Sequence, residues 1–222
     1  MEGGSAVKGR CIIMTAGDQH GIEKKDIGLR QGDFVICCDG GLRLAQRLHI
    51  RPDLIIGDFD SYTGELPEGV PVQRLKRDKD DTDSMTATKY ALEQGYDSLL
   101  YVAATGGRLD HLLGNMQMLA YVAEHAPGTP AEIVGAAERV WMLDDGGSLE
   151  IHAQAESTFS VLCHSDAAEG VHIHGARFEL NGATLTNRFP LGVSNRIAGH
   201  CASISVEKGI LFVILPKEVL AG

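Results

Sequence analysis

Short apolar runs alternate with segments of helical periodicity through the first part of the chain, and this alternation limits the fold more than any other feature. Nearly continuous apolar runs occupy residues 11–16, 34–38, 54–56 and 99–103. Such runs are typical of strands that are buried on both faces of a parallel sheet. Because helical segments separate them, we expect an α/β domain with a mostly parallel open sheet. Ligands of such a sheet bind at the carboxyl ends of its strands.

Two of the intervening segments carry clear helix signals. Thr82 is a suitable N-cap for a helix that ends at Gly95. The stronger pattern precedes Pro127, where apolar residues recur at helical spacing. These residues are Leu109, Leu112, Leu113, Met116, Ala120 and Ala123. Their spacing predicts an amphipathic helix with one apolar face.

After Asp144 the helical periodicity is lost, and short β-rich runs follow one another closely. These runs occupy residues 148–152, 158–164, 171–174 and 178–180. Two final runs, 200–206 and 210–215, flank Glu207-Lys208-Gly209 and predict a hairpin. We therefore expect an α/β domain at residues 1–143, followed by an all-β, sandwich-like domain at residues 144–222.

Charge and composition exclude several classes of partner. The formal net charge is -10, whereas a nucleic-acid surface needs clustered Lys and Arg. The first ten residues lack the apolar segment of a signal peptide, and no apolar run approaches the length of a membrane span. The five cysteines have neither C-x-x-C nor zinc-ligand spacing, which is typical of free thiols in a reducing compartment. We expect a cytoplasmic protein that binds neither nucleic acid nor membranes.

Two turns that follow predicted strands combine glycine with aspartate. In the first turn, Asp39-Gly40-Gly41, the glycines would let backbone N–H groups approach an anionic or planar ligand, although a tight strand–helix turn explains them equally well. In the second turn, Asp58 and Asp60 point the same way from an extended chain. Two neighbouring carboxylates repel each other unless a cation lies between them, and oxygen ligands of this kind suit Mg²⁺.

Two further segments open the predicted helices. Aspartates are concentrated at residues 78–83, where Asp80 and Asp83 are close enough to serve one site, and Lys79 and Thr82 add a cation and a hydroxyl. One acidic residue would suffice to cap the helix.

The last segment, residues 106–111, combines two glycines with charged side chains at the start of the strongest helix. Gly106 and Gly107 allow close approach, and Arg108 can donate two hydrogen bonds to phosphate oxygens. Asp110 and His111 follow on the first helical turn, where His111 is as easily structural as catalytic.

Together the four segments place carboxylates, cations and glycines at adjacent strand ends of one sheet. This composition is typical of metal-dependent phosphoryl transfer, in which carboxylates bind Mg²⁺ and cations and N–H groups bind phosphates. The P-loop lysine motif and the protein-kinase loop set are both absent from the sequence.

These segments, in this order and spacing, resemble those of the thiamine pyrophosphokinase family. The resemblance rests on residues 39–41, 57–61, 78–83 and 106–111 with Asn115, and on residues 183–186 and 191–195 in the β-rich part. It covers nearly the whole chain beyond the first ten residues.

The resemblance implies a homodimer that uses ATP and thiamine, with thiamine bound where the α/β domain of one subunit meets the β domain of the other. It implies that Mg²⁺ is bound by Asp58, Asp60 and Asp83. The residues around ATP would be Asp39, Gly40, Gly41, Lys79, Asp80, Thr82, Gly107, Arg108 and Asp110. The residues near the pyrimidine ring of thiamine would be Ser194 and Asn195.

The implied reaction is attack of the thiamine hydroxyl on the β-phosphorus of ATP, with AMP as the leaving group. Metal ions and Arg108 would stabilise the developing charge, and either Asp60 or Asp83 would accept the hydroxyl proton. Two alternatives stay open at this point. One is pyrophosphoryl transfer to another small alcohol, and the other is a nucleotide- or Mg²⁺-binding sensor domain on the same scaffold.

Overall fold

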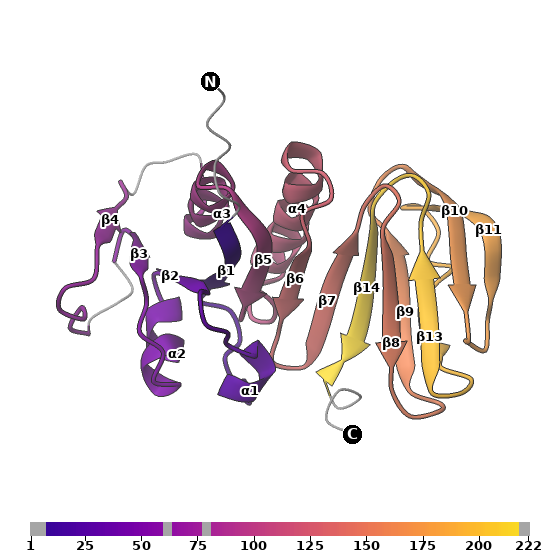
Figure 1. Ribbon diagram of the computed structural model, residues 1–222, viewed down its shortest axis with the longest axis horizontal. Coiled ribbons are helices and arrows are strands. Elements are labelled where there is room, and N and C mark those ends of the chain that lie inside the picture. Colours follow the sequence, from indigo (N-terminus) through magenta and orange to yellow (C-terminus); the bar gives the residue numbers. More distant parts are fainter. Residues whose placement is uncertain (1–7, 60–63, 77–80, 218–222) are drawn as a thin grey trace. The chain divides into compact units, whose positions relative to one another are not determined.

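The computed structural model of the protein describes residues 8–59, 64–76 and 81–217, and Figure 1 traces them along the chain. The chain forms two compact units. The N-terminal unit comprises Met1–Met118 with Ile133–Ala136, and the C-terminal unit comprises Leu119–Glu132 with Ala137–Gly222. None of the helices in the described ranges has the length and apolar character needed to span a bilayer.

The N-terminal unit contains the expected open α/β sheet. Its strands are β1 (Lys8–Met14), β2 (Phe34–Cys38), β3 (Leu54–Gly57), β4 (Val72–Arg74), β5 (Tyr96–Val102) and β6 (Ala131–Val134), in the spatial order β6-β5-β1-β2-β3-β4. The β5-β1-β2-β3-β4 pairings are all parallel. The helices are α1 (Lys24–Ile27), α2 (Gly41–Arg47), α3 (Asp83–Glu93) and the first part of α4 (Leu109–His125). The later residues of α4 and the first two of β6 are assigned to the C-terminal unit.

Both faces of this sheet are covered by helices. Successive strand residues point to opposite sides, so neighbouring residues of one strand pack against different helices. On one face, Leu100 and Val102 of β5 belong to the buried cluster that includes Leu44 of α2. Tyr101, which lies between them, points to the other face, where its hydroxyl shares a 3.0 Å hydrogen bond with Thr88 of α3. The uninterrupted apolar runs in the sequence therefore correspond to strands buried on both sides.

The two predicted helices are present, but the apolar stripe of the second is only partly buried. Thr82 caps α3 as expected, since its Oγ1 accepts a 3.2 Å hydrogen bond from the Met85 N–H. In α4, Leu119 is fully buried, whereas Leu109 and Leu113 are 68% and 55% exposed. The buried face of α4 is formed by Met118, Leu119, Val122 and Ala123, so of the predicted stripe only Ala123 is buried.

The C-terminal unit consists of two antiparallel sheets around one core. Its strands are β7 (Glu138–Leu143), β8 (Ser148–His152), β9 (Thr158–Cys163), β10 (Ala167–His174), β11 (Leu180–Thr186), β12 (Asn195–Arg196), β13 (Cys201–Ser205) and β14 (Leu211–Pro216). One sheet has the order β12-β9-β14-β7 and the other β11-β10-β13-β8. Phe159 and Val213 of the first sheet share a buried cluster with Ile173 and Ile204 of the second. This arrangement confirms the sandwich-like all-β prediction.

The predicted hairpin at the end of the chain is wrong. β13 pairs with β8 and β10, whereas β14 pairs with β7 and β9 in the other sheet. The turn residues bond to β10 instead of to each other: the Glu169 N–H donates to the Lys208 carbonyl and the Glu207 N–H donates to the Glu169 carbonyl. Gly209, with a φ of 105°, completes a corner that carries the chain between the two sheets.

A buried ion pair fastens β1 to the chain that leads into β2. Arg10 donates to both carboxylate oxygens of Asp33, at 3.1 and 2.5 Å, and the two side chains are only 8% and 5% exposed. Arg10 also donates to the Gly28 carbonyl at 2.8 Å. Burial raises the pKa of Asp33, but the hydrogen bonds from Arg10 and from the Arg30 backbone outweigh it and leave that pKa below its ordinary value.

We predict that Asp33→Asn lowers the free energy of unfolding at neutral pH by about 3 kcal/mol, because it leaves Arg10 buried without a countercharge. The pKa of Asp33 is depressed in the folded state, so its contribution is complete above the unfolded carboxyl pKa and is lost as the pH falls through the folded value. Urea unfolding at several pH values should show the difference between wild type and variant shrinking in acid. The exposed Asp97→Asn is the matched control, and a pH-independent difference would contradict the ion-pair account.

Candidate functional site

The N-terminal unit contains a cavity of about 880 Å³ at the carboxyl ends of its parallel strands. The described lining comes from the β1–α1 loop, the β2–α2 turn, the start of α3, the β5–α4 loop and the first turns of α4. The register explains why these segments meet: Met14 of β1 lies opposite Cys37 of β2 on one side and Val102 of β5 on the other. A cavity of this size can hold a ligand as large as a nucleotide.

The β1–α1 loop is fastened to the β5–α4 loop by its backbone. The Gly17 N–H donates to the Ala103 carbonyl and the Asp18 N–H donates to the Thr105 carbonyl, both at 2.9 Å. A Cβ at Gly17 would overlap the carbonyl oxygens of Ala103 and Thr105, so only glycine allows this approach. The four motifs predicted from the sequence do not include this loop, although Gly17-Asp18 repeats the pattern of glycine beside aspartate after a strand.

Asp18 contributes a carboxylate to the cavity. It accepts hydrogen bonds from the His20 N–H at 2.9 Å and contacts the His20 ring Nδ1 at 2.8 Å. The hydrogen bond from the His20 backbone, followed by the contact with its ring, lowers the pKa of Asp18. The carboxylate is therefore ionised at neutral pH.

The β2–α2 turn brings Asp39 to the end of β3. The Asp39 N–H donates to the Ile56 carbonyl at 3.0 Å, and a Cβ at Gly57 would lie 3.3 Å from the Asp39 nitrogen. Asp58, the next residue, therefore follows a strand end that is packed against Asp39. Gly41 is explained by packing, because a Cβ there would overlap the Met14 carbonyl. Gly40 lines the cavity, and a Cβ there would lie only 2.9 Å from the Cβ of Ala16.

The start of α3 contributes Thr82, Asp83 and Ser84 to the cavity wall. Ser84 Oγ donates a 3.4 Å hydrogen bond to Asn115 Oδ1 of α4, and Asn115 Nδ2 donates to the Ala104 carbonyl at 2.7 Å. Asn115 thus links the first turn of α3 to the loop after β5. This connection holds Asp83 at the cavity without using its carboxylate.

Arg108 and Asp110 form an exposed ion pair at the start of α4. Arg108 Nε and Nη2 donate to the two oxygens of Asp110, at 3.1 and 2.5 Å. These hydrogen bonds raise the pKa of Arg108 and lower the pKa of Asp110. Arg108 lines the cavity, and its Nη1 group takes no part in this ion pair. Gly107 beside it has a φ of 69°, with no atom near the position of a Cβ.

The remaining sequence-predicted residues lie elsewhere. Asp60, Lys79 and Asp80 fall outside the described residues. Ser194 and Asn195 belong to the C-terminal unit. Asn195 is 3% exposed. Its side-chain Oδ1 accepts a hydrogen bond from the Phe178 N–H at 3.0 Å, and its Nδ2 donates to the Phe178 carbonyl at 2.7 Å. Asn195 therefore holds the Phe178 segment in place. Ser194 is exposed, with a φ of 59°.

The cavity lining fits a complex of a hard cation with phosphates. Asp39 and Asp83, together with Asp18, offer carboxylate oxygens, the ligands that Mg²⁺ prefers. Arg43 and Arg108 offer planar groups of hydrogen-bond donors that match phosphate oxygens. Such a lining can bind a metal–polyphosphate and stabilise charge that develops during phosphoryl transfer.

Comparisons with known proteins match both parts of the chain to one family. The sequence model described as "Thiamin pyrophosphokinase, catalytic domain" matches residues 28–129, and that described as "Thiamin pyrophosphokinase, vitamin B1 binding domain" matches residues 148–211. The thiamine pyrophosphokinase of Bacillus subtilis (strain 168) is 27% identical over 173 residues, which cover 74% of this chain and 78% of that protein.

Solved structures share the fold. The crystal structure of thiamine pyrophosphokinase from Bacillus subtilis superposes with a TM-score of 0.82 at 25% identity, covering 94% of this chain and 99% of that one. Thiamin pyrophosphokinase from Candida albicans superposes with a TM-score of 0.74 at 16% identity, covering 94% and 89% of the two chains.

Gly17→Ala should lower the free energy of unfolding by about 1–3 kcal/mol, because its Cβ would push the β1–α1 loop away from two backbone carbonyls. Gly114→Ala is the matched control: it lies inside α4 with no atom near its Cβ position, so alanine should stabilise the helix by up to about 1 kcal/mol. Thermal unfolding measures both changes. Equal melting temperatures for Gly17→Ala and wild type would show that the two loops are not packed as described.

Proposed function

The chain belongs to the thiamin pyrophosphokinase family, and on that premise we propose that it transfers a pyrophosphoryl group from ATP to the hydroxyl of thiamine. The products would be thiamine diphosphate and AMP. The matched catalytic region, residues 28–129, includes the greater part of the cavity lining. One observation carries the proposal: three strand ends and the start of α3 bring carboxylates, arginines and glycine-containing loops to a single cavity of nucleotide size.

We propose that Mg²⁺ is held by Asp58, Asp60 and Asp83. Asp83 lies at the cavity, and Asp58 follows the strand end that packs against Asp39, which supports this assignment. When bound, Mg²⁺ would neutralise negative charge on the phosphates. Asp39, Gly40 and Thr82 would surround the nucleotide from the β2–α2 turn and the start of α3, and Gly41 would support that turn through its packing on β1.

Arg108 would act on the transferred group. Its Nε and Nη2 are already aligned by Asp110, so the Nη1 side of the guanidinium can meet a phosphate oxygen without a large search of side-chain conformations. The open space at Gly107 would admit the phosphates beside it. Lys79 and Asp80 complete the proposed ATP site, and either Asp60 or Asp83 would accept the proton of the attacking hydroxyl.

We propose further that the enzyme is a homodimer in which Ser194 of one subunit approaches the thiamine of the other. The Ser194 side chain is exposed. Hydrogen bonds within the same chain hold its loop in place: Asn195 is bonded to Phe178, and the Ser194 N–H donates to Ser160 Oγ at 3.0 Å. Asn195 would therefore support the pyrimidine-binding loop through these backbone bonds.

The proposed reaction is tested by thiamine-dependent release of AMP from ATP in the presence of Mg²⁺. Wild type should release AMP only when thiamine is present, and Asp83→Asn should lose at least about a hundredfold in kcat, as expected when one charge-stabilising group is removed. Asp97→Asn, exposed and remote from the cavity lining, is the control. Release that depends on another alcohol would indicate a different substrate, and binding of ATP without turnover would indicate a sensor.

Arg108→Lys keeps the positive charge but loses the planar pair of donors. We predict a decrease in kcat/KM of about tenfold or more, which corresponds to the loss of one good transition-state contact. The exposed Arg188→Lys serves as the matched control. Steady-state kinetics would refute the role of Arg108 if both variants matched wild type.

Hybrid dimers test the proposed shared site. Asp83→Asn damages the ATP side, and Ser194→Trp would block the thiamine side with a bulky group. Each variant alone should be inactive, whereas exchanged mixtures should recover up to about a quarter of the wild-type sites, because each hybrid contains one intact site. If fully exchanged mixtures of folded variants stay inactive, each site lies within one chain.

A further inference from the structure

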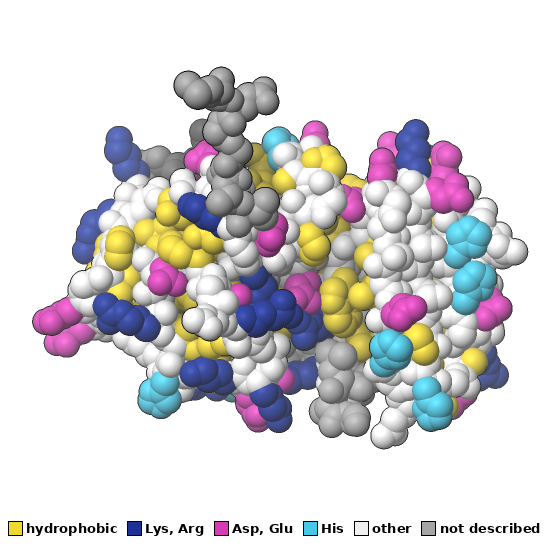
Figure 2. All heavy atoms as spheres, viewed as in Figure 1, with side chains coloured by type: hydrophobic (Ala, Val, Ile, Leu, Met, Phe, Trp, Pro, Cys, Tyr) yellow, Lys and Arg dark blue, Asp and Glu magenta, His cyan; other side chains and the backbone are white. Residues whose placement is uncertain are grey.

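The four-stranded sheet of the C-terminal unit turns a face rich in metal-binding side chains to solvent. Ile151 of β8 and Ala202 of β13 are 4% and 1% exposed and point into the core. Because strand residues alternate, Glu150 and His152 on β8 and Cys201 on β13 point to the opposite side. Figure 2 shows histidine side chains gathered over this part of the molecule.

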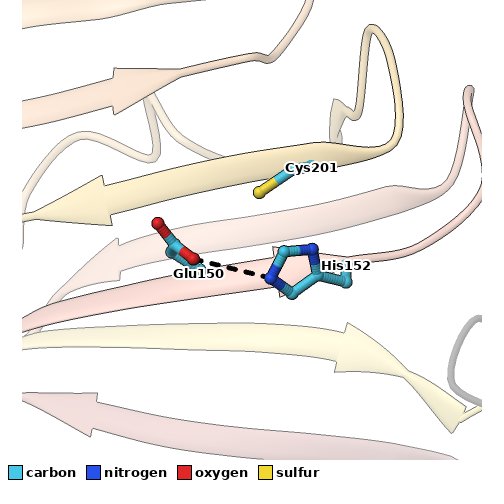
Figure 3. A group of neighbouring side chains, drawn as sticks. All are labelled: Glu150, His152 and Cys201. Carbon is cyan, nitrogen blue, oxygen red and sulfur yellow. Dashed lines mark ion pairs between the residues drawn. The ribbon is translucent and has the colours of Figure 1, made fainter.

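Backbone pairing holds these three side chains together. Cys201 lies directly opposite His152 in the β8–β13 ladder, and directly opposed residues have Cβ atoms about 5 Å apart. Glu150 precedes His152 by two residues and shares its face. The possible ligand atoms of all three residues lie within 4.8 Å of one another. Figure 3 shows the Glu150 carboxylate directed at the His152 ring, with Cys201 beside them on the neighbouring strand.

The spacing suits a tetrahedral ion. In a tetrahedron with metal–ligand bonds of about 2.1 Å, two ligand atoms are about 3.4 Å apart. His152 Nε2 and Glu150 Oε2 are 3.5 Å apart, so these two need almost no movement to bind one ion. Rotation of the partly exposed Cys201 side chain would bring Sγ to the third position.

The ligand types select the metal. A thiolate and an imidazole favour Zn²⁺ and related transition metals over Mg²⁺, which prefers oxygen ligands. We propose that Glu150, His152 and Cys201 bind one Zn²⁺-class ion, with water as the fourth ligand. This site is separate from the proposed Mg²⁺ site and does not depend on the proposed reaction.

The position of the cluster indicates what the ion does. β8 is the edge strand of its sheet, and the His152–Cys201 pair is the last pair of its ladder with β13. A shared ion would tie the end of this edge strand to its neighbour. Without metal, the exposed pair of Glu150 and His152, at 70% and 72% exposure, contributes little to stability. Metal that binds only the folded chain therefore raises the melting temperature.

Two other side chains on this sheet provide an internal comparison. His172 and His174 of β10 also share a face, with ring centroids 5.8 Å apart. The metal-ligand groups found among the described residues do not include them. Cys163, a thiol of similar exposure in β9, is likewise outside the cluster. His174→Ala and Cys163→Ser are therefore matched controls for the two softer ligands.

The test is a Zn²⁺ titration of the metal-free, untagged full chain in excess Mg²⁺, followed by calorimetry, with Co²⁺ as a spectroscopic probe. Wild type should bind one Zn²⁺ per chain at the cluster, with a rise in melting temperature and a thiolate-to-cobalt charge-transfer band. Cys201→Ser should abolish the band, and Cys201→Ser and His152→Ala should each weaken Zn²⁺ binding by at least about tenfold. Glu150→Gln should weaken it in the same direction, and the two controls should behave as wild type.

Three outcomes would overturn the site. One is wild type that binds no Zn²⁺ in the titration. Another is unchanged binding in both Cys201→Ser and His152→Ala, which would place the ion elsewhere. The third is an equal loss in His174→Ala or Cys163→Ser. Zn²⁺ binding is also measured with Cys201→Ala. If Cys201→Ser fails to fold, Cys201→Ala still shows whether the thiol is needed.

Discussion

Backbone hydrogen bonds among β1, β2, β3 and β5 bring four parallel strand ends to one edge of the N-terminal sheet. The loops that follow β1, β2 and β5 lie at this edge together with the start of α3, so residues far apart in the sequence line one cavity. Close packing then fixes the loops, since Gly17 and Gly41 each sit where a Cβ would overlap the backbone of a neighbouring strand or loop. The chemistry of the cavity depends on this packing as much as on its charged side chains.

In the C-terminal unit, too, the backbone of the sheets positions the side chains that we propose to be functional. Its two sheets share one core, and Gly209 turns the corner that carries the chain from β13 to β14. Asn195 holds the Phe178 segment through hydrogen bonds. The β8–β13 ladder holds Glu150, His152 and Cys201 together. In each case backbone pairing sets the positions, and the side chains add the chemistry.

The features that depend on local sequence could be predicted. The strands with continuous apolar runs, the Thr82 cap and the absence of helices between Asp144 and Pro216 follow from periodicity and capping, and the structure has them. The change to strands alone comes earlier than Asp144, because α4 ends at His125 and β6 and β7 follow it. β4 gives no such signal, because its three residues are all exposed. The β13–β14 hairpin was wrong because the Glu207 turn pairs with β10, a partner that the local sequence does not reveal. The proposed zinc site adds Cys201 of β13 to Glu150 and His152 of β8 across a ladder, so the sequence spacing does not reveal the full ligand set.

We propose that the thiamine hydroxyl attacks the β-phosphorus of ATP bound at this cavity. Phosphorus-31 NMR of a reaction containing ATP, Mg²⁺, thiamine and the protein tests it most directly, because it reports which bond of ATP is broken. We expect AMP and thiamine diphosphate to appear together in equal amounts. Formation of ADP with thiamine monophosphate, or an ATP spectrum that does not change when thiamine is present, would contradict it.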